Sequence, residues 1–219
     1  MTIFHVKSLA QGVALAGLLL TAGLVFGQPA DLLEQAQRGD AKAQLSLGAM
    51  YENGEGVAQS DRQAAQWYQR AAEHGLPAAQ VALASMYNAG QGVEASEQQA
   101  LKWYRLAADQ GHAPAQFTLG AKFERGIEVD RDDAQAVKWF RLAAGQGHAK
   151  AQLHLGLMYA SGRGVDQDSA QAAMWLQRAA GQGDAVARDV LRSEDFAAHT
   201  VSPNAQRAAG KGQAEASGE

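Results

Sequence analysis

Apolar and small residues recur with helical spacing through the middle of the chain. In the stretch 41–53, Ala43, Leu47, Gly48 and Tyr51 are separated by four, one and three positions, which places them on one face of an α-helix. The pattern predicts a helix that buries this face. Three later stretches repeat it, with Ala79, Leu83, Ala84 and Tyr87, then Ala115, Leu119, Gly120 and Phe123, then Ala151, Leu155, Gly156 and Tyr159.

A second helix is predicted after each of these. A cap residue stands three positions before a glutamine, as in Ser60 and Gln63, which is a capping box in which each side chain satisfies a free N–H group of the other residue. The same pairs are Ser96 and Gln99, Asp132 and Gln135, Asp168 and Gln171. The expected core face then carries the equivalents of Ala64, Trp67, Tyr68, Ala71 and Ala72.

The two helices form a unit that repeats every 36 residues. Trp67, Trp103, Trp139 and Trp175 keep this period, and so do the glycines that follow the helices, Gly54 and Gly75 in the first unit. We divide the chain into four repeats, 40–75, 76–111, 112–147 and 148–183. One helix pair cannot bury its own apolar face, so the units must stack. The predicted fold is an all-α, superhelical solenoid, with a capping half-repeat at 28–39, a capping helix at 184–191 and a disordered tail at 192–219.

The repeat pattern, A-x-x-x-L-G-x-x-Y-x-x-G-x-G-V followed by A-x-x-W-Y-x-x-A-A-x-x-G, resembles the Sel-one-like repeat (SLR) family, relatives of the tetratricopeptide repeat. The resemblance covers residues 40–183. It implies helix pairs stacked into a right-handed superhelix whose concave face binds protein partners. The departures are Ala84, Phe123, Glu128 at the second loop glycine, Phe140 and Leu176.

Residues 1–27 differ from the rest. Lys7 is followed by an uncharged stretch from Gly12 to Phe26 and then by Gly27, which is the pattern of a secretory signal peptide. Cleavage after Gly27 predicts an exported protein, periplasmic if the source is a Gram-negative bacterium. The alternative is an uncleaved anchor in the inner membrane, because the stretch from Ser8 to Phe26 is long enough to span a bilayer.

Composition narrows the function. The chain of 219 residues contains 47 alanines and 4 prolines, which favours helices, and no cysteine, which excludes disulfides and thiolate zinc sites. The net charge of −4 gives no basic footprint for nucleic acid. We therefore expect a monomer with a protein or peptide partner, with no nucleic-acid partner and no membrane insertion once the signal is cleaved.

No residue set predicts catalysis or a cofactor. The phosphate-binding, nucleotide-binding, zinc-protease and serine-hydrolase motifs are absent, and no lysine follows a serine at the third position. His112 and His148 share one repeat position and are expected in exposed turns between repeats, too far apart for one metal ion. The acids Asp130, Asp132 and Asp133 lack the spacing of a calcium loop. We therefore expect no enzyme, no metal and no cofactor.

A partner surface is predicted on the first helices, on the side away from the core. Its residues change from repeat to repeat, as expected of a surface that has a ligand rather than a packing task, although an unconstrained surface would show the same. The candidate partner-binding residues are Lys42, Leu45, Ser46, Ala49, Glu52, Asn53, Val81, Ser85, Asn88, Phe117, Thr118, Ala121, Glu124, Arg125, Lys150, His154 and Leu157.

Three functions fit this interpretation to different degrees. The first is an exported, non-enzymatic scaffold or adaptor that holds a protein partner in the concave groove. The second is an immunity protein or inhibitor that neutralises a secreted toxin. The third is a β-lactam-binding or β-lactam-hydrolysing enzyme. The resemblance implies this activity only for cysteine-rich members of the family, and the absence of cysteine in this chain disfavours it.

Overall fold

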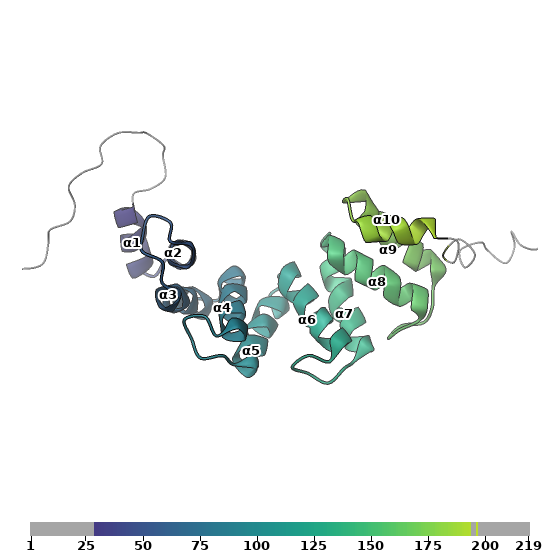
Figure 1. Cartoon of the computed structure of the whole chain (residues 1–219), viewed down its shortest axis with the longest axis horizontal. Helices are drawn as coiled ribbons and strands as arrows, with labels where there is room; N and C mark the ends of the chain where they lie inside the picture. Colours follow the sequence, from purple (N-terminus) through teal and green to yellow (C-terminus); the bar gives the residue numbers. More distant parts are fainter. Residues whose placement is uncertain (1–28, 194–195, 197–219) are drawn as a thin grey trace, which may run out of the picture.

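The computed structural model describes residues 29–193 and residue 196. In this part of the chain all regular structure is α-helical and no strand occurs (Figure 1). The described helices are α1 (Pro29–Gln37), α2 (Ala41–Asn53), α3 (Asp61–Glu73), α4 (Pro77–Ala89), α5 (Glu97–Asp109), α6 (Ala113–Arg125), α7 (Asp133–Gly145), α8 (Ala149–Ser161), α9 (Ser169–Gly181) and α10 (Ala185–Arg192).

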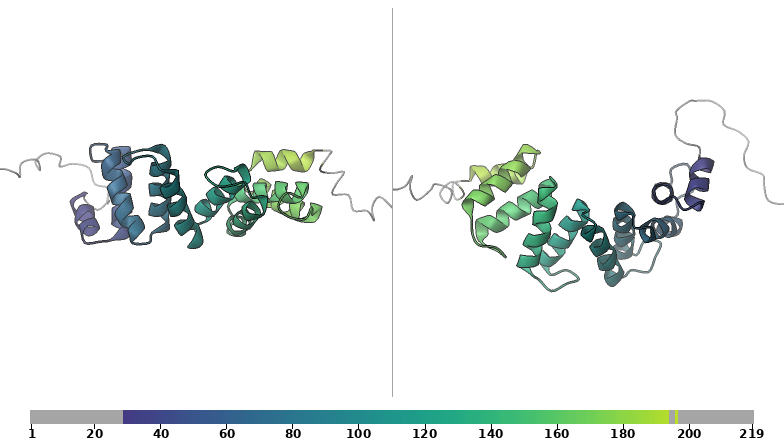
Figure 2. Two further views of the ribbon diagram at one scale, coloured as in Figure 1. Left: turned by 90° about the horizontal axis from the view of Figure 1, so that it is seen from below. Right: turned by 180° about the vertical axis from the view of Figure 1, so that it is seen from behind.

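The helices follow one another along an elongated, curved stack with α1 and α10 at its two ends (Figures 1 and 2). Each helix packs against the helices next to it in sequence. The core is accordingly a row of clusters rather than one centre, and each cluster joins neighbouring repeats. The predicted all-α solenoid is confirmed.

Each pair of helices within a repeat packs closely. A Cβ added at Gly48 of α2 would lie 2.4 Å from the ring of Tyr68 in α3, so glycine is needed there for the ring to fit. Phe140 and Leu176 take the place of Tyr68 against Gly120 and Gly156. The small residue expected inside the first helix therefore serves close approach of the second helix.

Only one of the two hydrogen bonds of each predicted capping box forms. The Ser60 side chain accepts a hydrogen bond from the backbone N–H of Gln63, and Ser96, Asp132 and Asp168 cap their helices in the same way. The reciprocal half is wrong: the backbone N–H of Ser60 donates to the carbonyl oxygen of Tyr51, at 2.8 Å. The same loop-closing bond occurs in all four repeats. Because it uses the N–H group of the cap residue, the glutamine side chain has nothing to satisfy.

The tryptophans are less buried than their period suggests. Trp67, Trp103 and Trp139 are half-buried, and Trp175 alone of the four is buried. A lysine or arginine cation lies over each ring, with Arg70 4.5 Å from the Trp67 centroid. The deepest positions of the second helices belong instead to their alanines and to the residue after tryptophan, such as Phe140 at 0% exposure.

A column of buried glutamines joins the repeats. Gln80 of α4 donates through Nε2 to the carbonyl oxygen of Ala72 in the preceding repeat, and its Oε1 accepts from Gln110 at 2.8 Å. The same arrangement holds for Gln116 with Gln146 and for Gln152 with Gln182. Gln44 makes the first bond, to Ala36, but its buried Oε1 has no partner because His74 stands where the other repeats have glutamine.

The two described ends are half-units. Helix α1 packs against α2 through Leu32 and Ala36, and α10 packs against α9 through Ala187. The predicted signal segment 1–27, Gln28 and most of the tail, 194–195 and 197–219, lie outside the described residues. Among the helices that are described, none is both long and apolar enough to cross a bilayer.

Candidate partner-binding surface

The predicted partner-binding residues all lie on α2, α4, α6 and α8, and none of them is buried. We call the surface that they form the first-helix face. Its exposed members are Lys42, Ser46, Asn53, Ser85, Asn88, Arg125 and Lys150. Its half-buried members are Leu45, Ala49, Glu52, Val81, Phe117, Thr118, Ala121, Glu124, His154 and Leu157.

The apolar members of this face also hold the stack together. Leu45 packs against the cluster formed by α3 and α4, and Val81 packs against the cluster formed by α4, α5 and α6. Leu157 packs against the cluster that α8, α9 and α10 share. These side chains therefore have a structural task, and the polar members carry most of the freedom to meet a partner.

In the first repeat the face carries a carboxylate held by tyrosine. The Tyr68 hydroxyl of α3 donates to Oε2 of Glu52 at the end of α2. The pKa of Tyr68 is raised, mainly because the phenol is buried and to a smaller extent because of the hydrogen bond to Glu52 and the charge of that carboxylate. Glu52 is thereby fixed in position with one oxygen occupied.

The third and fourth repeats meet at a second carboxylate. Glu124 of α6 contacts Nδ1 of His154 in α8 at 2.9 Å through Oε2, and it forms an ion pair with Arg163 through Oε1. The Glu124 side chain is 14% exposed, whereas that of Arg163 is 41% exposed. One carboxylate therefore links two helices and the following loop, and the arginine remains accessible from solvent.

Aromatic rings line the same place. Phe117 of α6 stacks on His148, with centroids 4.7 Å apart and planes 21° apart, and it makes a T-shaped contact with His154 at a centroid distance of 5.6 Å. The His154 ring lies 5.0 Å from that of Phe140. The structure thus brings Phe117, Glu124 and His154 together, three residues that the sequence placed on this face without indicating that they touch.

Two participants were not predicted. Arg163 lies in the loop after α8, where its repeat position offers no periodic signal, since the equivalent residues are Glu55, Gln91 and Ile127. His148 was expected in an exposed turn, and so was His112. Both are half-buried helix N-caps instead, with Nδ1 accepting from Ala151 and Ala115 respectively, and burial lowers the pKa of each.

The other acids do not form an ion site. Asp132 caps α7, and Asp133 pairs with Arg131 at 2.8 Å, so that this hydrogen bond lowers the pKa of Asp133. Within residues 29–193 and 196, no group of three or more histidine, aspartate or glutamate side chains is placed to hold a metal ion. The first-helix face presents charged, amide and aromatic side chains.

The chain is similar to several solved structures. A Sel1 repeat protein from Oxalobacter formigenes is 42% identical with a TM-score of 0.72, covering 74% of this chain and 47% of its own. A protective antigen with an SLR fold from uropathogenic Escherichia coli is 34% identical, covering 71% of this chain and 41% of its own, at a TM-score of 0.41. An immunity protein from Pseudomonas aeruginosa is 22% identical, covering 77% and 65%, at a TM-score of 0.49. This chain thus spans less than half the length of the first two relatives.

The sequence profile of the Sel1 repeat matches four consecutive segments, residues 41–76, 77–112, 113–148 and 149–184. Each begins one residue after the division drawn from the tryptophan and glycine period. No curated protein matches the chain. The four matches cover more than half of the sequence, and the chain therefore belongs to the Sel1 repeat family.

Proposed function

We propose that this protein is an exported, non-enzymatic scaffold that binds a protein partner through its first-helix face. Sel1 repeats typically mediate protein–protein interaction. The observation that carries the proposal is the cluster of Phe117, Glu124, His154 and Arg163, where charged and aromatic groups from two repeats converge at the surface.

The mechanism is presentation of a pre-formed surface. The Glu124 contacts and the bonds from the buried glutamines to the preceding second helix hold neighbouring repeats in one arrangement before a partner arrives. Little ordering entropy is then lost on binding, which leaves more of the contact energy as affinity. The exposed cations Arg125 and Lys150 and the amide of Asn88 supply specificity around this arrangement.

Export and the absence of catalysis are parts of the same proposal. Residues 1–27 support export through their signal-peptide pattern, and an uncleaved N-terminal anchor is the alternative. The lack of a recognised catalytic motif supports a binding role over β-lactam chemistry. An adaptor and a toxin-neutralising immunity protein would use the same face, and they differ in whether the partner is a second structural protein or a single secreted enzyme.

Site-specific photocrosslinking in the native cell tests the surface directly. The full chain carries a photoreactive residue at Ser46 or Arg125 on the first-helix face, or at Gln66 or Gln177 on second helices, all exposed. We expect a discrete crosslinked protein from the first pair of positions and none from the second. Equal crosslinks from both pairs would contradict the proposal.

The captured protein is then purified and its affinity is measured. Arg125→Glu with Lys150→Glu is expected to weaken binding at least tenfold. The control, Arg62→Glu with Arg192→Glu, changes the net charge equally at exposed positions on other faces and should leave the affinity unchanged. A one-to-one complex that inhibits a secreted enzyme would identify an immunity protein, whereas two simultaneous partners would identify an adaptor.

A further inference from the structure

The two central second helices share a surface that the outer repeats lack. Helix α5 carries Lys102, Arg105 and Leu106, and α7 carries Lys138, Arg141 and Leu142 at the same repeat positions. The corresponding residues are Gln66, Gln69 and Arg70 in α3, and Met174, Gln177 and Arg178 in α9. We call the six residues of α5 and α7 the central basic face.

Packing does not require its leucines. Leu106 is 39% exposed and Leu142 is 45% exposed, among the most exposed large apolar residues of the described chain. At the same position in α3 and α9, Arg70 and Arg178 lie over the neighbouring tryptophans. Since a charged residue is accommodated there in two repeats, the leucines serve no need of the core that the repeat imposes.

The face extends over two repeats. Trp139 of α7 packs against the buried cluster that α4, α5 and α6 share, which contains Ala100 and Tyr104 of α5. The lysines extend over these tryptophan rings, with Lys102 Nζ 5.5 Å from the Trp103 centroid and Lys138 Nζ 5.8 Å from that of Trp139. Cations and apolar atoms are thus interleaved over two repeats.

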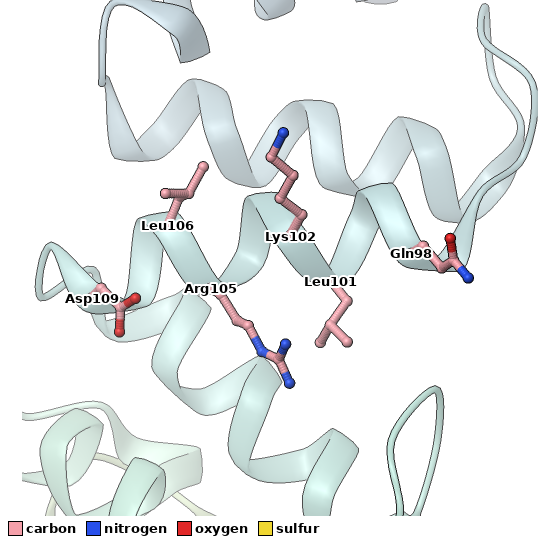
Figure 3. A pocket seen from close by; sticks show the side chains of 6 residues that line it. All are labelled: Gln98, Leu101, Lys102, Arg105, Leu106 and Asp109. Atoms are coloured by element: carbon pink, nitrogen blue, oxygen red, sulfur yellow. The ribbon is translucent and has the colours of Figure 1, made fainter.

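The face is also hollowed. An open depression of about 410 Å³ runs along α5, lined by Gln98, Leu101, Lys102, Arg105, Leu106 and Asp109. Figure 3 shows Lys102 and Leu106 projecting to one side of the helix and Arg105 and Leu101 to the other. Each side therefore presents one leucine together with one cation, a spacing that suits an apolar side chain flanked by carboxylates.

The charges of this face are largely unpaired. In the part of the chain that the structure describes, Lys102, Arg105 and Lys138 form no ion pair, and Arg141 donates to the Tyr159 hydroxyl at 2.9 Å. Asp109 is the one acid that lines the depression. Four cations on α5 and α7, in a chain of net charge −4, create a local positive potential that attracts an acidic ligand.

We propose that the central basic face binds an acidic, amphipathic segment of a partner protein. Apolar side chains of that segment occupy the depression along α5 and contact Leu106 and Leu142, while its carboxylates pair with the lysines and arginines. An anionic membrane surface fits less well, because Leu101 and Leu106 line a depression together with Lys102 and Arg105. This site is separate from the first-helix face and does not depend on its function.

The test uses the full chain and two fluorescent helical peptides of equal length, each with leucine on one face. One peptide carries glutamate and the other lysine on the remaining positions. We expect the glutamate peptide to bind at least tenfold more tightly, by fluorescence anisotropy, and to weaken as salt rises. Lys102→Glu with Lys138→Glu should abolish this preference, and Leu106→Ser with Leu142→Ser should weaken binding at fixed salt.

Arg62→Glu with Arg192→Glu is the matched control, since it changes the net charge by the same amount at exposed positions outside the central basic face and should change nothing. Circular dichroism of each variant establishes that the helices remain folded. Equal affinity for both peptides, or no effect of the Lys102 and Lys138 changes, would overturn the proposal. Cosedimentation with phosphatidylglycerol vesicles but not with phosphatidylcholine vesicles, without peptide binding, would also overturn it and assign the face to a membrane.

Discussion

Lys122 and Glu128 form an ion pair inside the stack, with each side chain 8% exposed. The other repeats have methionine and glycine at these two positions, and a Cβ added at Gly56 would lie 3.4 Å from Met50 Cε. Lys122 also lies 5.6 Å from the Tyr104 ring centroid, and burial, together with the Glu128 charge, raises the pKa of that tyrosine. A methionine and a glycine have thus been exchanged for a buried pair of charges in the third repeat.

Reversal of only one of these two substitutions should destabilise the protein. Lys122→Met leaves the Glu128 carboxylate buried without its cation, and we expect a loss of about 3–5 kcal/mol in the free energy of unfolding. Lys122→Met with Glu128→Gly restores the pair found in the other repeats. It also removes the buried Oε2 of Glu128, which has no hydrogen-bond partner, and places glycine at a position whose φ is 63°. We expect the free energy of unfolding of the double variant, measured in urea, to equal or exceed that of the wild type. A double variant with the same free energy of unfolding as Lys122→Met would contradict this account.

Completion of the glutamine column should stabilise the first repeat. His74→Gln supplies the donor that Gln110, Gln146 and Gln182 supply elsewhere, and Gln44 Oε1 is buried without a partner. We expect a gain of about 1 kcal/mol in the free energy of unfolding. Gln110→His is the reverse experiment and should cost about 1–3 kcal/mol, because it leaves the Gln80 oxygen unsatisfied. A His74→Gln protein with an unchanged urea midpoint would be evidence against this hydrogen-bond ladder.

The histidine caps predict a loss of stability in mild acid. His112 and His148 accept a backbone hydrogen bond through Nδ1, and burial lowers their pKa in the folded state. The folded protein therefore binds fewer protons than the unfolded chain. The stabilisation is complete above the ordinary histidine pKa of about 6.5 and is lost as the pH falls through the lowered value.

Asp40 and Asp184 cap α2 and α10 through their carboxylates, in the way that His112 and His148 cap α6 and α8 through Nδ1. His112→Asp is therefore the matched variant. We expect its melting temperature to fall less than that of the wild type between pH 7.5 and 5.5, by an amount that corresponds to about 1 kcal/mol. Identical pH dependence in the two proteins would show that the His112 cap contributes nothing.

Core truncations should distinguish two adjacent aromatic residues. Phe140 is fully buried against Gly120, so Phe140→Ala is expected to cost about 3–5 kcal/mol. Trp139 is half-buried, and Trp139→Ala should cost less, about 2 kcal/mol. Urea unfolding of the two variants side by side measures the difference. No change in either would contradict the repeat register, and a larger loss for Trp139 would contradict the burial found for the second helices.

The fold could be predicted in detail because it is local. Each first helix is specified by an apolar face with a terminal glycine, and each second helix by a cap residue, so that the expected stretch 41–53 coincides with α2. The 36-residue period then multiplies every such signal by four. The sequence pattern also indicated which side of the first helices is left uncovered, since none of the predicted partner-binding residues is buried.

Contacts between residues far apart in the chain were not accessible in the same way. The meeting of Glu124 with His154 and Arg163 and the bond from Gln80 to the carbonyl oxygen of Ala72 both depend on how one repeat is set against the next. Amphipathic periodicity states which side of a helix is covered, but not by which residue or at what distance. The sequence by itself determined the helices, the cap residues of the second helices and the number of repeats, because those follow from interactions within a few residues. The tertiary structure alone decided which polar groups are paired and which cations remain unpaired at the surface, because these depend on the rotation and spacing between neighbouring repeats.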